Sequence, residues 1–310
     1  MKLISVIVPC FNEEGNVLNM ADKLVNVFDS FHNKYDYEII FIDNDSTDKT
    51  RDIIREICKT NKKIKAIFNA KNFGQFNSPY YAMLQTTGDA TISIACDFQE
   101  PVDLIYDFIK EWELGYKIVI GVKNNSHEGF FLKSLKKFYY SLIKKFSTVE
   151  QIKMFTGFGL YDKSFIEILK KLDDPTPFLR GIVAELGFKR KEIQFDQGIR
   201  VHGKSSNNFL TLYDAAMLSF TSYTKLGLRI ATFIGFIALI FSFIVALVYL
   251  IMKLIWWDRF YAGMIPVLIG MLFLGSVQIF FIGIIGEYVL SINQRLMKRP
   301  LVVEEERINF

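Results

Sequence analysis

The chain has 310 residues, enough for one large domain or two small ones, and 51% of them are hydrophobic, which is high for a purely soluble protein. Its net charge of +4 is modest and spread over the chain, so nucleic acid is not an expected partner. The three cysteines are scattered and form no CxxC pair, which argues against both a disulfide framework and a zinc site.

The first half of the chain alternates short β-branched runs with amphipathic stretches, a pattern typical of a parallel sheet with crossover helices. The predicted strands are apolar almost throughout, as strands buried on both faces tend to be, and cover 3–8, 37–42, 64–68, 91–96 and 117–122. The predicted helices cover 16–31, 47–60, 77–84 and 102–112. Ser46 or Thr47 is a suitable N-cap for the second helix. The predicted fold class is therefore α/β with a mostly parallel sheet.

A basic amphipathic helix is predicted at 131–146, where apolar residues form one helical stripe and five lysines lie elsewhere. Such a helix either packs on the core with a solvated lysine face or lies in the membrane interface. The stretch 210–228 allows the same interpretation. The domain would then rest against the bilayer.

Two runs without a charged residue follow, at 230–252 and 261–286, and each is longer than the roughly 20 residues that cross a bilayer. Buried core helices are the alternative, but they rarely reach this length without a charge. Basic residues gather outside the two runs, so both outer flanks are predicted to be cytosolic, with the short Trp256-Trp257 connection on the far side. These basic residues are Lys225, Arg229, Arg295, Lys298 and Arg299.

The predicted organisation follows from these runs. A cytosolic domain covers 1–208, a juxtamembrane amphipathic segment 209–229, two transmembrane helices 230–252 and 261–286, and a cytosolic tail 287–310. The protein is expected in the inner (plasma) membrane, in contact with membrane lipids. The sequence leaves its oligomeric state open, a homo-oligomer included.

Acidic residues recur directly after predicted strands, where open parallel sheets bind their ligands. Glu13 follows the first strand, and Asp43 and Asp45 follow the second. Asp43 ends an apolar strand, where a carboxylate could accept hydrogen bonds from a nucleobase or ribose. Asp45 and Asp48 have an alternative role, since they could cap the following helix.

Phosphate groups would need a counter-charge at this edge, because the sequence has no GxGxxG and no GxxxxGK[ST] motif. A hard divalent cation held by one or two carboxylates and by a diphosphate supplies one. Asp97, after the fourth predicted strand, together with Gln99 or Glu100, is the candidate platform for Mg²⁺ or Mn²⁺.

Taken together, these motifs resemble those of family 2 glycosyltransferases of the GT-A fold, in the polyprenyl-phosphate glycosyltransferase group related to dolichyl-phosphate mannose synthase. Residues 5–14 (SVIVPCFNEE) resemble the opening nucleotide-binding motif, 42–48 (IDNDSTD) the second motif, and 97–101 (DFQEP) the DLQDPP metal site. The segments 72–74 (NFG) and 87–90 (TGDA) are similar to linking motifs. The resemblance covers the whole chain. It implies a nucleotide site of Pro9, Phe11, Glu13, Asp43 and Asp45, and a metal site of Asp97 and Gln99.

The sequence departs from the family pattern in places. Glu100 replaces the usual final Asp of the metal motif, and Asn44-Asp45 stands where Asp-Gly is common. Many relatives carry a TGD carboxylate, assigned as a catalytic base or acceptor-site residue, where this chain has Phe158. A phosphate monoester tolerates that loss, because its second pKa is about 6 and it is largely dianionic at neutral pH.

Such an acceptor needs positioning and charge neutralisation. The segment 200–206 (RVHGKSS) is similar to the family's basic segment before the membrane helices, and Arg200, Lys204 and Ser205 are the predicted acceptor-phosphate residues. A solvated basic loop is the alternative interpretation. With Asp97, Arg200 and Lys204 make up the predicted catalytic set.

The predicted reaction is a single inverting displacement, in which a lipid phosphate attacks the anomeric carbon of a nucleotide-activated sugar. By resemblance, the donor is UDP-glucose or a related UDP-hexose, and the acceptor is a polyprenyl phosphate such as undecaprenyl phosphate. Two alternatives stay open. One is a membrane-anchored glycosyltransferase with another lipid, polysaccharide or protein acceptor, and the other is a catalytically silent membrane scaffold.

Overall fold

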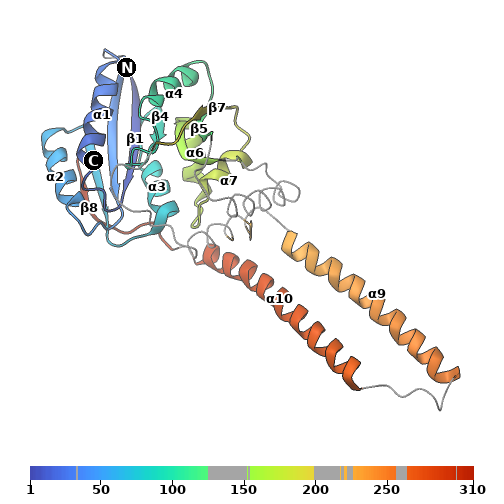
Figure 1. Ribbon diagram of the computed structural model, residues 1–310. Coiled ribbons are helices and arrows are strands. Elements are labelled where there is room, and N and C mark those ends of the chain that lie inside the picture. The colour runs from blue at the N-terminus through green and yellow to red at the C-terminus, as the bar shows by residue number, and fades with distance from the viewer. Residues whose placement is uncertain are drawn as a thin grey trace.

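An eight-stranded mixed sheet in the order β7-β5-β6-β4-β1-β2-β3-β8 forms the centre of the α/β domain (Figure 1). The computed structural model describes residues 1–32, 34–124, 152, 154–198, 217, 220–221, 226–255, 264–297 and 299–310. The strands are β1 (Lys2–Cys10), β2 (Tyr35–Asp43), β3 (Ile64–Asn69), β4 (Ala90–Ser93), β5 (Ile118–Lys123), β6 (Phe155–Asp162), β7 (Arg190–Phe195) and β8 (Glu304–Ile308). All five predicted strands are present, although the fourth ends at Ser93 rather than at residue 96.

The sheet is parallel through β4, β1, β2 and β3, so the carboxyl ends of these strands meet at one edge. Strand β6 runs antiparallel between β4 and β5, while β7 is parallel to β5. Strand β1 is buried on both faces, with Ile4, Val6 and Val8 in one core cluster and Ile7 in the other. This burial explains the nearly continuous apolar run of the sequence.

The described helices comprise those that cover both faces of the sheet and two longer ones that follow them in the chain. They are α1 (Val17–Asp29), α2 (Thr50–Thr60), α3 (Gly74–Leu84), α4 (Leu104–Glu113), α6 (Lys163–Leu172), α7 (Leu179–Glu185), α9 (Leu226–Ile255) and α10 (Met264–Leu296). The four predicted helices are confirmed, but the predicted N-cap of α2 is wrong. Its N-cap is Lys49 without a side-chain cap, because Ser46 instead accepts a 2.9 Å hydrogen bond from the backbone N–H of Asn12.

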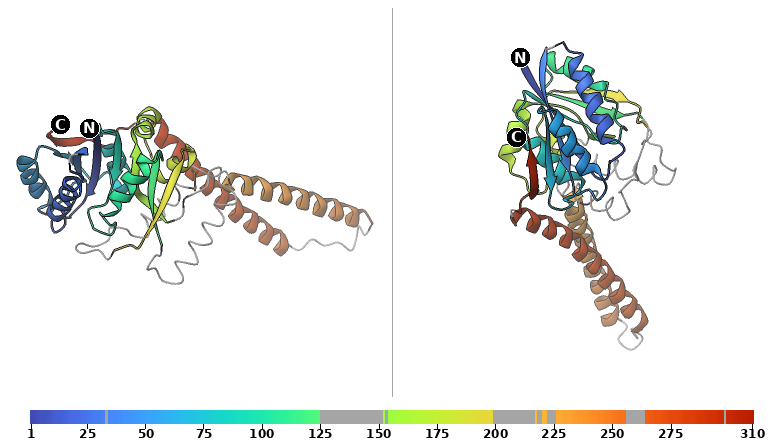
Figure 2. Two further views of the ribbon diagram at one scale, coloured as in Figure 1. Left: turned by 90° about the horizontal axis from the view of Figure 1, so that it is seen from above. Right: turned by 90° about the vertical axis from the view of Figure 1, so that its left-hand side faces the viewer.

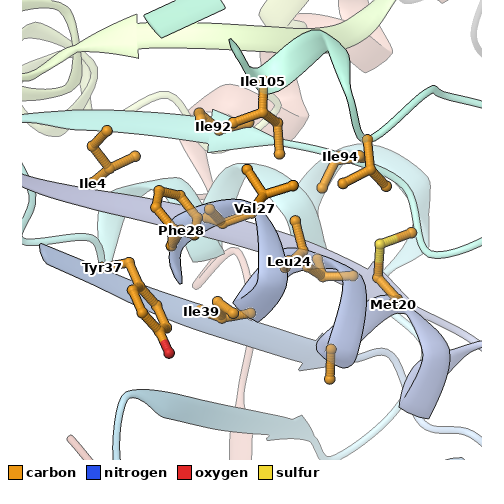
Figure 3. Close-up of a cluster of buried hydrophobic side chains, with 14 of the residues drawn as sticks. Ile4, Met20, Leu24, Val27, Phe28, Tyr37, Ile39, Ile92, Ile94 and Ile105 are labelled. Carbon is orange, nitrogen blue, oxygen red and sulfur yellow. The ribbon is translucent and has the colours of Figure 1, made fainter. Parts of the chain in front are cut away.

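Two apolar clusters hold these layers together. Figure 3 shows Leu24, Val27 and Phe28 of α1 beside strand residues such as Ile39 and Ile92. The other cluster joins α3, α6 and α7 to the opposite face. Each fully buried Ile, Leu or Phe contributes about 1.5–3 kcal/mol relative to an exposed one. This burial fixes the strand ends that carry the site.

The helices α9 and α10 lie side by side and extend away from the α/β domain (Figures 1 and 2). Their large apolar side chains face outward, with Phe243 of α9 68% exposed and Ile279 of α10 72% exposed. Among the described residues, one helical stretch is long and apolar enough to cross a membrane, Phe273–Leu296, with a mean hydropathy of 1.8. A shorter apolar stretch, Thr232–Val245, lies within α9.

The chain returns to the domain after α10. The segment 287–310, expected to be a tail, contains the end of α10 and then β8, which pairs antiparallel with β3 at the edge of the sheet (Figure 1). The pairing brings Ile308 opposite Ala66 and Glu306 opposite Phe68. This strand was not predicted from the sequence.

Candidate active site

A pocket of about 1240 Å³ lies beyond the carboxyl ends of β1, β2 and β4. The loops that follow these strands form one wall, and residues of β5, β6, the start of α3, the start of α7 and the last third of α10 also line the pocket. This is the position at which open α/β sheets bind ligands. The pocket therefore connects the sheet edge with the helix that leads away from the domain.

The loops after β1 and β2 are hydrogen-bonded to each other. The side-chain oxygen of Asn12, a residue with a φ of 56°, accepts a 2.8 Å hydrogen bond from the backbone N–H of Thr47. The backbone N–H of Glu13 donates to the hydroxyl of Thr50 at 2.8 Å. These contacts hold the two loops together, and Phe11, which is exposed, lines the pocket. Pro9, Phe11 and Glu13 all line the pocket, as the sequence predicted for a shared site.

Asp43 lies directly behind this wall. Its carboxylate is fully buried and accepts hydrogen bonds from Arg51 Nε at 2.6 Å and from the backbone N–H of Ser46 at 3.1 Å. No described residue donates to its second oxygen, Oδ2. Asn44, the next residue, lines the pocket, whereas Asp43 and Asp45 do not. A buried acceptor without a partner is costly unless a ligand satisfies it.

Asp45 has a different environment from Asp43. Its side chain is 44% exposed and lies 3.7 Å from Arg51 Nη2. Its φ of 69° places it in the left-handed region, which a non-glycine residue adopts at a cost. The departure from the usual glycine in this motif therefore falls at a turn that would favour glycine.

Asp97 lines the pocket and is mostly buried. One of its carboxylate oxygens accepts a 3.1 Å hydrogen bond from the backbone N–H of Gln99. Glu100 is turned inward and accepts 2.8 Å hydrogen bonds from the backbone N–H of Ala95 and from the hydroxyl of Thr156. Burial raises the pKa of the Glu100 carboxyl group, and these two hydrogen bonds oppose that rise.

The residues at Asp97 fit a hard divalent cation that shares its ligands with a nucleotide. No cluster of three or more His, Cys, Asp or Glu side chains suited to a metal occurs among the described residues. Mg²⁺ does not require such a cluster, since it is often bound by one or two carboxylates together with phosphate oxygens and water. Asp97 and Gln99 both line the pocket and carry the kind of oxygen atoms that such a cation takes as ligands. The two carboxylate oxygens of Glu100 accept hydrogen bonds from the protein.

Phe158 provides no acid or base. It is 1% exposed, and its ring centroid lies 4.8 Å from that of Phe108 and 5.5 Å from that of Phe195. The ring belongs to the core between β6 and α4. The neighbouring Thr156, which lines the pocket, binds the acidic motif instead.

Several charged and polar residues of the pocket were not predicted from the sequence. Lys123 ends β5, Arg180 lies in the first turn of α7, and Glu287, Ser291 and Gln294 line the pocket from α10. The last three are spaced by four and three residues and therefore share one helix face. An acidic residue that follows a long uncharged run is a signal that could have identified Glu287.

The predicted acceptor residues Arg200, Lys204 and Ser205 lie outside the described residues, as does the predicted amphipathic helix at 131–146. The described chain approaches them at Gly198, whose backbone N–H donates a 3.0 Å hydrogen bond to the carbonyl of Gln99. The described chain therefore contacts the Asp97 motif at Gly198.

A mostly parallel sheet with hydrogen-bonded acidic loops at one edge is an arrangement in which α/β proteins bind ligands, and comparison with known proteins names the class. Residues 5–172 match Glycosyl transferase family 2. The chain is 30% identical over 305 residues to the bactoprenol glucosyl transferase of Shigella phage SfX, covering 98% of this chain and 99% of that protein. It is 28% identical over 298 residues to the prophage bactoprenol glucosyl transferase homolog of Escherichia coli (strain K12), covering 96% of each.

Among solved structures, the mannosyl-3-phosphoglycerate synthase from Rubrobacter xylanophilus is 16% identical with a TM-score of 0.49, covering 70% of this chain and 71% of that one. The chain belongs to glycosyltransferase family 2. It is a glycosyltransferase with the predicted GT-A fold, in which helices flank a mostly parallel sheet.

Proposed function

We propose that this glycosyltransferase moves a sugar from a nucleotide sugar to a polyprenyl phosphate at the cytosolic face of the plasma membrane. One observation carries the proposal: a single pocket is lined both by the acidic loops of the sheet and by Glu287, Ser291 and Gln294 of α10. A water-soluble donor and a lipid acceptor could therefore meet there. The bactoprenol glucosyl transferases among its relatives support glucose as the sugar and undecaprenyl phosphate as the lipid.

The donor would occupy the sheet end of the pocket. Pro9, Phe11 and Glu13, which line the pocket, would contact the nucleotide. Asp43, buried behind them, would accept a hydrogen bond from the base or the ribose through Oδ2. The proposed nucleotide set also includes Asp45. Asp97 and Gln99 would hold Mg²⁺ or Mn²⁺, which when bound would neutralise charge on the nucleoside diphosphate.

The acceptor phosphate would approach from the α10 side. One of its oxygens attacks the anomeric carbon, the bond from that carbon to the diphosphate oxygen breaks, and the configuration inverts. A dianionic phosphate needs no protein base, which is compatible with a buried Phe158. We place Arg200, Lys204 and Ser205 around the acceptor phosphate. Lys123 and Arg180 add positive charge to the pocket wall.

We infer that α9 and α10 cross the membrane as a hairpin. Their 30 and 33 residues correspond to about 45 and 50 Å at 1.5 Å per residue, more than the roughly 30 Å hydrocarbon core. Strand β8 returns the chain to the domain after α10, so the segments before α9 and after α10 belong on the same side of the bilayer. The Trp256-Trp257 connection would then face outward.

A donor panel tests the proposal. The purified full-length protein in detergent is given undecaprenyl phosphate, Mg²⁺ and one radiolabelled sugar donor at a time: UDP-glucose, UDP-galactose, UDP-N-acetylglucosamine or GDP-mannose. We expect the label in the organic extract with UDP-glucose, and little of it with Asp97→Asn. Label that appears only on protein or polysaccharide would indicate another acceptor. Absence of both transfer and metal-dependent donor hydrolysis would indicate a silent scaffold.

A further inference from the structure

The last residues of the chain are built into the α/β domain. The side-chain amide of Asn309 donates to the carbonyls of Cys58 at 2.7 Å and Ile64 at 2.8 Å, which fixes the end of β8. The hydroxyl of Tyr81 donates to Glu304 at 2.8 Å. The backbone N–H of Ala70 donates to the carbonyl of Val303 at 2.9 Å, just before the strand. These contacts hold the strand in register beside β3.

Two successive acidic residues of β8 pair with two arginines of α2. Glu306 accepts hydrogen bonds from Arg55 at 3.1 Å and 2.8 Å. Glu305 lies 2.8 Å from Arg51 Nη1. The two pairs are similar in chemistry, but their arginines differ in their other contacts. Arg55 also bonds to Asp52 on its own helix, whereas Arg51 also bonds to Asp43 at the carboxyl end of β2.

Arg51 is held on three sides. Its Nε donates to Asp43 at 2.6 Å, its Nη2 donates to the carbonyl of Asn69 at 2.5 Å, and its Nη1 pairs with Glu305. A guanidinium group is planar and presents its N–H groups in a fixed fork, so contacts at two edges determine the direction of the third. The position of Glu305 therefore bears on the orientation of the Asp43 carboxylate.

We propose that Glu305 is a positioning residue of the donor site, acting on Asp43 through Arg51. This inference rests on the proposed function in one respect, that Asp43 contacts the nucleotide. The chain segment that follows the last membrane-directed helix thereby becomes part of the enzyme's donor-binding apparatus. Through Arg51, this segment orients the buried carboxylate of Asp43, whose Oδ2 has no hydrogen-bond partner among the described residues.

Loss of the Glu305 carboxylate should not unfold the protein. Its side chain is 57% exposed, and ion pairs at such exposure contribute little to stability. The expected effect of Glu305→Gln is instead a three- to tenfold rise in the Kd for UDP and in the KM for the donor, with kcat nearly unchanged. Glu306→Gln is the matched control, because it removes the neighbouring pair without touching Arg51.

A double-mutant cycle measured by calorimetric titration of UDP in the presence of Mg²⁺ tests the chain of contacts. We expect Glu305→Gln to weaken UDP binding in the wild-type background and to have no further effect in the Arg51→Gln background. Equal losses in both backgrounds, or an equal loss for Glu306→Gln, would overturn the positioning role. Normal UDP binding by Glu305→Gln would do the same. If the wild-type protein binds neither UDP nor GDP, the proposed function itself fails first.

Discussion

The hydroxyl of Thr156 on β6 donates a 2.8 Å hydrogen bond to the carboxylate of Glu100 in the loop after β4. The contact ties the acidic motif of one strand to its antiparallel neighbour. Both residues line the pocket, so this contact joins two segments of the same wall.

We expect Thr156→Val to destabilise the protein, and to do so more at higher pH. Burial raises the pKa of Glu100 and the Thr156 hydrogen bond opposes that rise, so the variant has a still higher pKa. A carboxyl group whose pKa is higher in the folded protein than in the unfolded chain takes up protons on folding. The free energy of unfolding therefore falls as the pH rises above the pKa of the unfolded chain, which is about 4.3. The loss should reach about 1–3 kcal/mol near neutral pH.

Thermal unfolding in detergent at about pH 5 and pH 8 checks this expectation, because the unfolded carboxyl group is ionised at both. Thr156→Ser, which keeps the hydroxyl, is the control. A Thr156→Val deficit that is the same at both pH values would contradict the account of Glu100.

Glu38 should show the opposite dependence on pH. Burial alone raises its pKa, but Lys65, Ser5 and the backbone N–H of Thr87 donate to its carboxylate and lower the pKa overall. A carboxyl group whose pKa is lower in the folded protein than in the unfolded chain stabilises the fold above the pKa of the unfolded chain, which is about 4.3. This stabilisation is lost as the pH falls through the pKa of the folded protein. We expect Glu38→Gln to lower the Tm at neutral pH. The difference from wild type should shrink below about pH 4 in thermal unfolding scans.

Gly88 is required by the close approach of the 87–90 segment to β1. An added Cβ would lie 2.6 Å from Ser5 Oγ and 2.8 Å from the carbonyl oxygen of Leu3. Gly88→Ala should therefore cost about 1–3 kcal/mol and lower the Tm. Gly283→Ala on α10 is the control, since a Cβ there meets no described atom within 4 Å. An equal Tm for the two variants would remove the steric explanation.

Much of the sheet could be predicted from the sequence because its strands are buried on both faces and read as continuous apolar runs. Once the strands were located, the acidic residues that follow them could be predicted to lie together, since parallel strands place their carboxyl ends at one edge. Thus Glu13 and Asp97 do share a pocket. The start of α2 was missed because Ser46 bonds to Asn12 of another loop, a contact that helical periodicity does not reveal.

The remaining parts depend on contacts between distant segments. Strand β8 carries four charged residues in five positions, a composition that suggests a solvated tail rather than a strand. Its partners Arg51 and Arg55 lie some 250 positions earlier, and only the folded chain brings them together. The α10 wall of the pocket was missed for the same reason, because Glu287 meets the sheet edge through tertiary packing.

Asp97→Asn should abolish most of the transfer activity while the fold survives. Asn has nearly the same volume and keeps an oxygen that can accept the hydrogen bond from Gln99, but it removes the negative charge that a divalent cation requires. We expect an unchanged Tm without metal and a greatly weakened Mn²⁺ dependence of UDP binding. Near wild-type turnover at limiting Mg²⁺ would show that Asp97 is not the metal platform.

Arg200→Lys should impair use of the lipid acceptor although it keeps the charge. An arginine can hold a phosphate with two parallel hydrogen bonds, whereas lysine offers a point charge. Gly198, two residues earlier in the sequence, donates a backbone hydrogen bond to the carbonyl of Gln99. Loss of one charge-assisted contact is worth about 1.5–3 kcal/mol, or about ten- to hundredfold in kcat/KM for the lipid. Arg200→Ala should lose at least as much.

Transfer kinetics and donor affinity are to be measured in parallel for wild type and both Arg200 variants, with donor binding expected to stay nearly unchanged. The pH profile gives an independent readout. Because Phe158 supplies no base, the acidic limb should follow the acceptor's own ionisation at about pH 6, provided that chemistry limits the rate. Unchanged lipid kinetics, or a loss confined to donor binding, would show that Arg200 does not hold the acceptor phosphate. In that case Arg180 and Lys123, which line the pocket, become the cations to replace next.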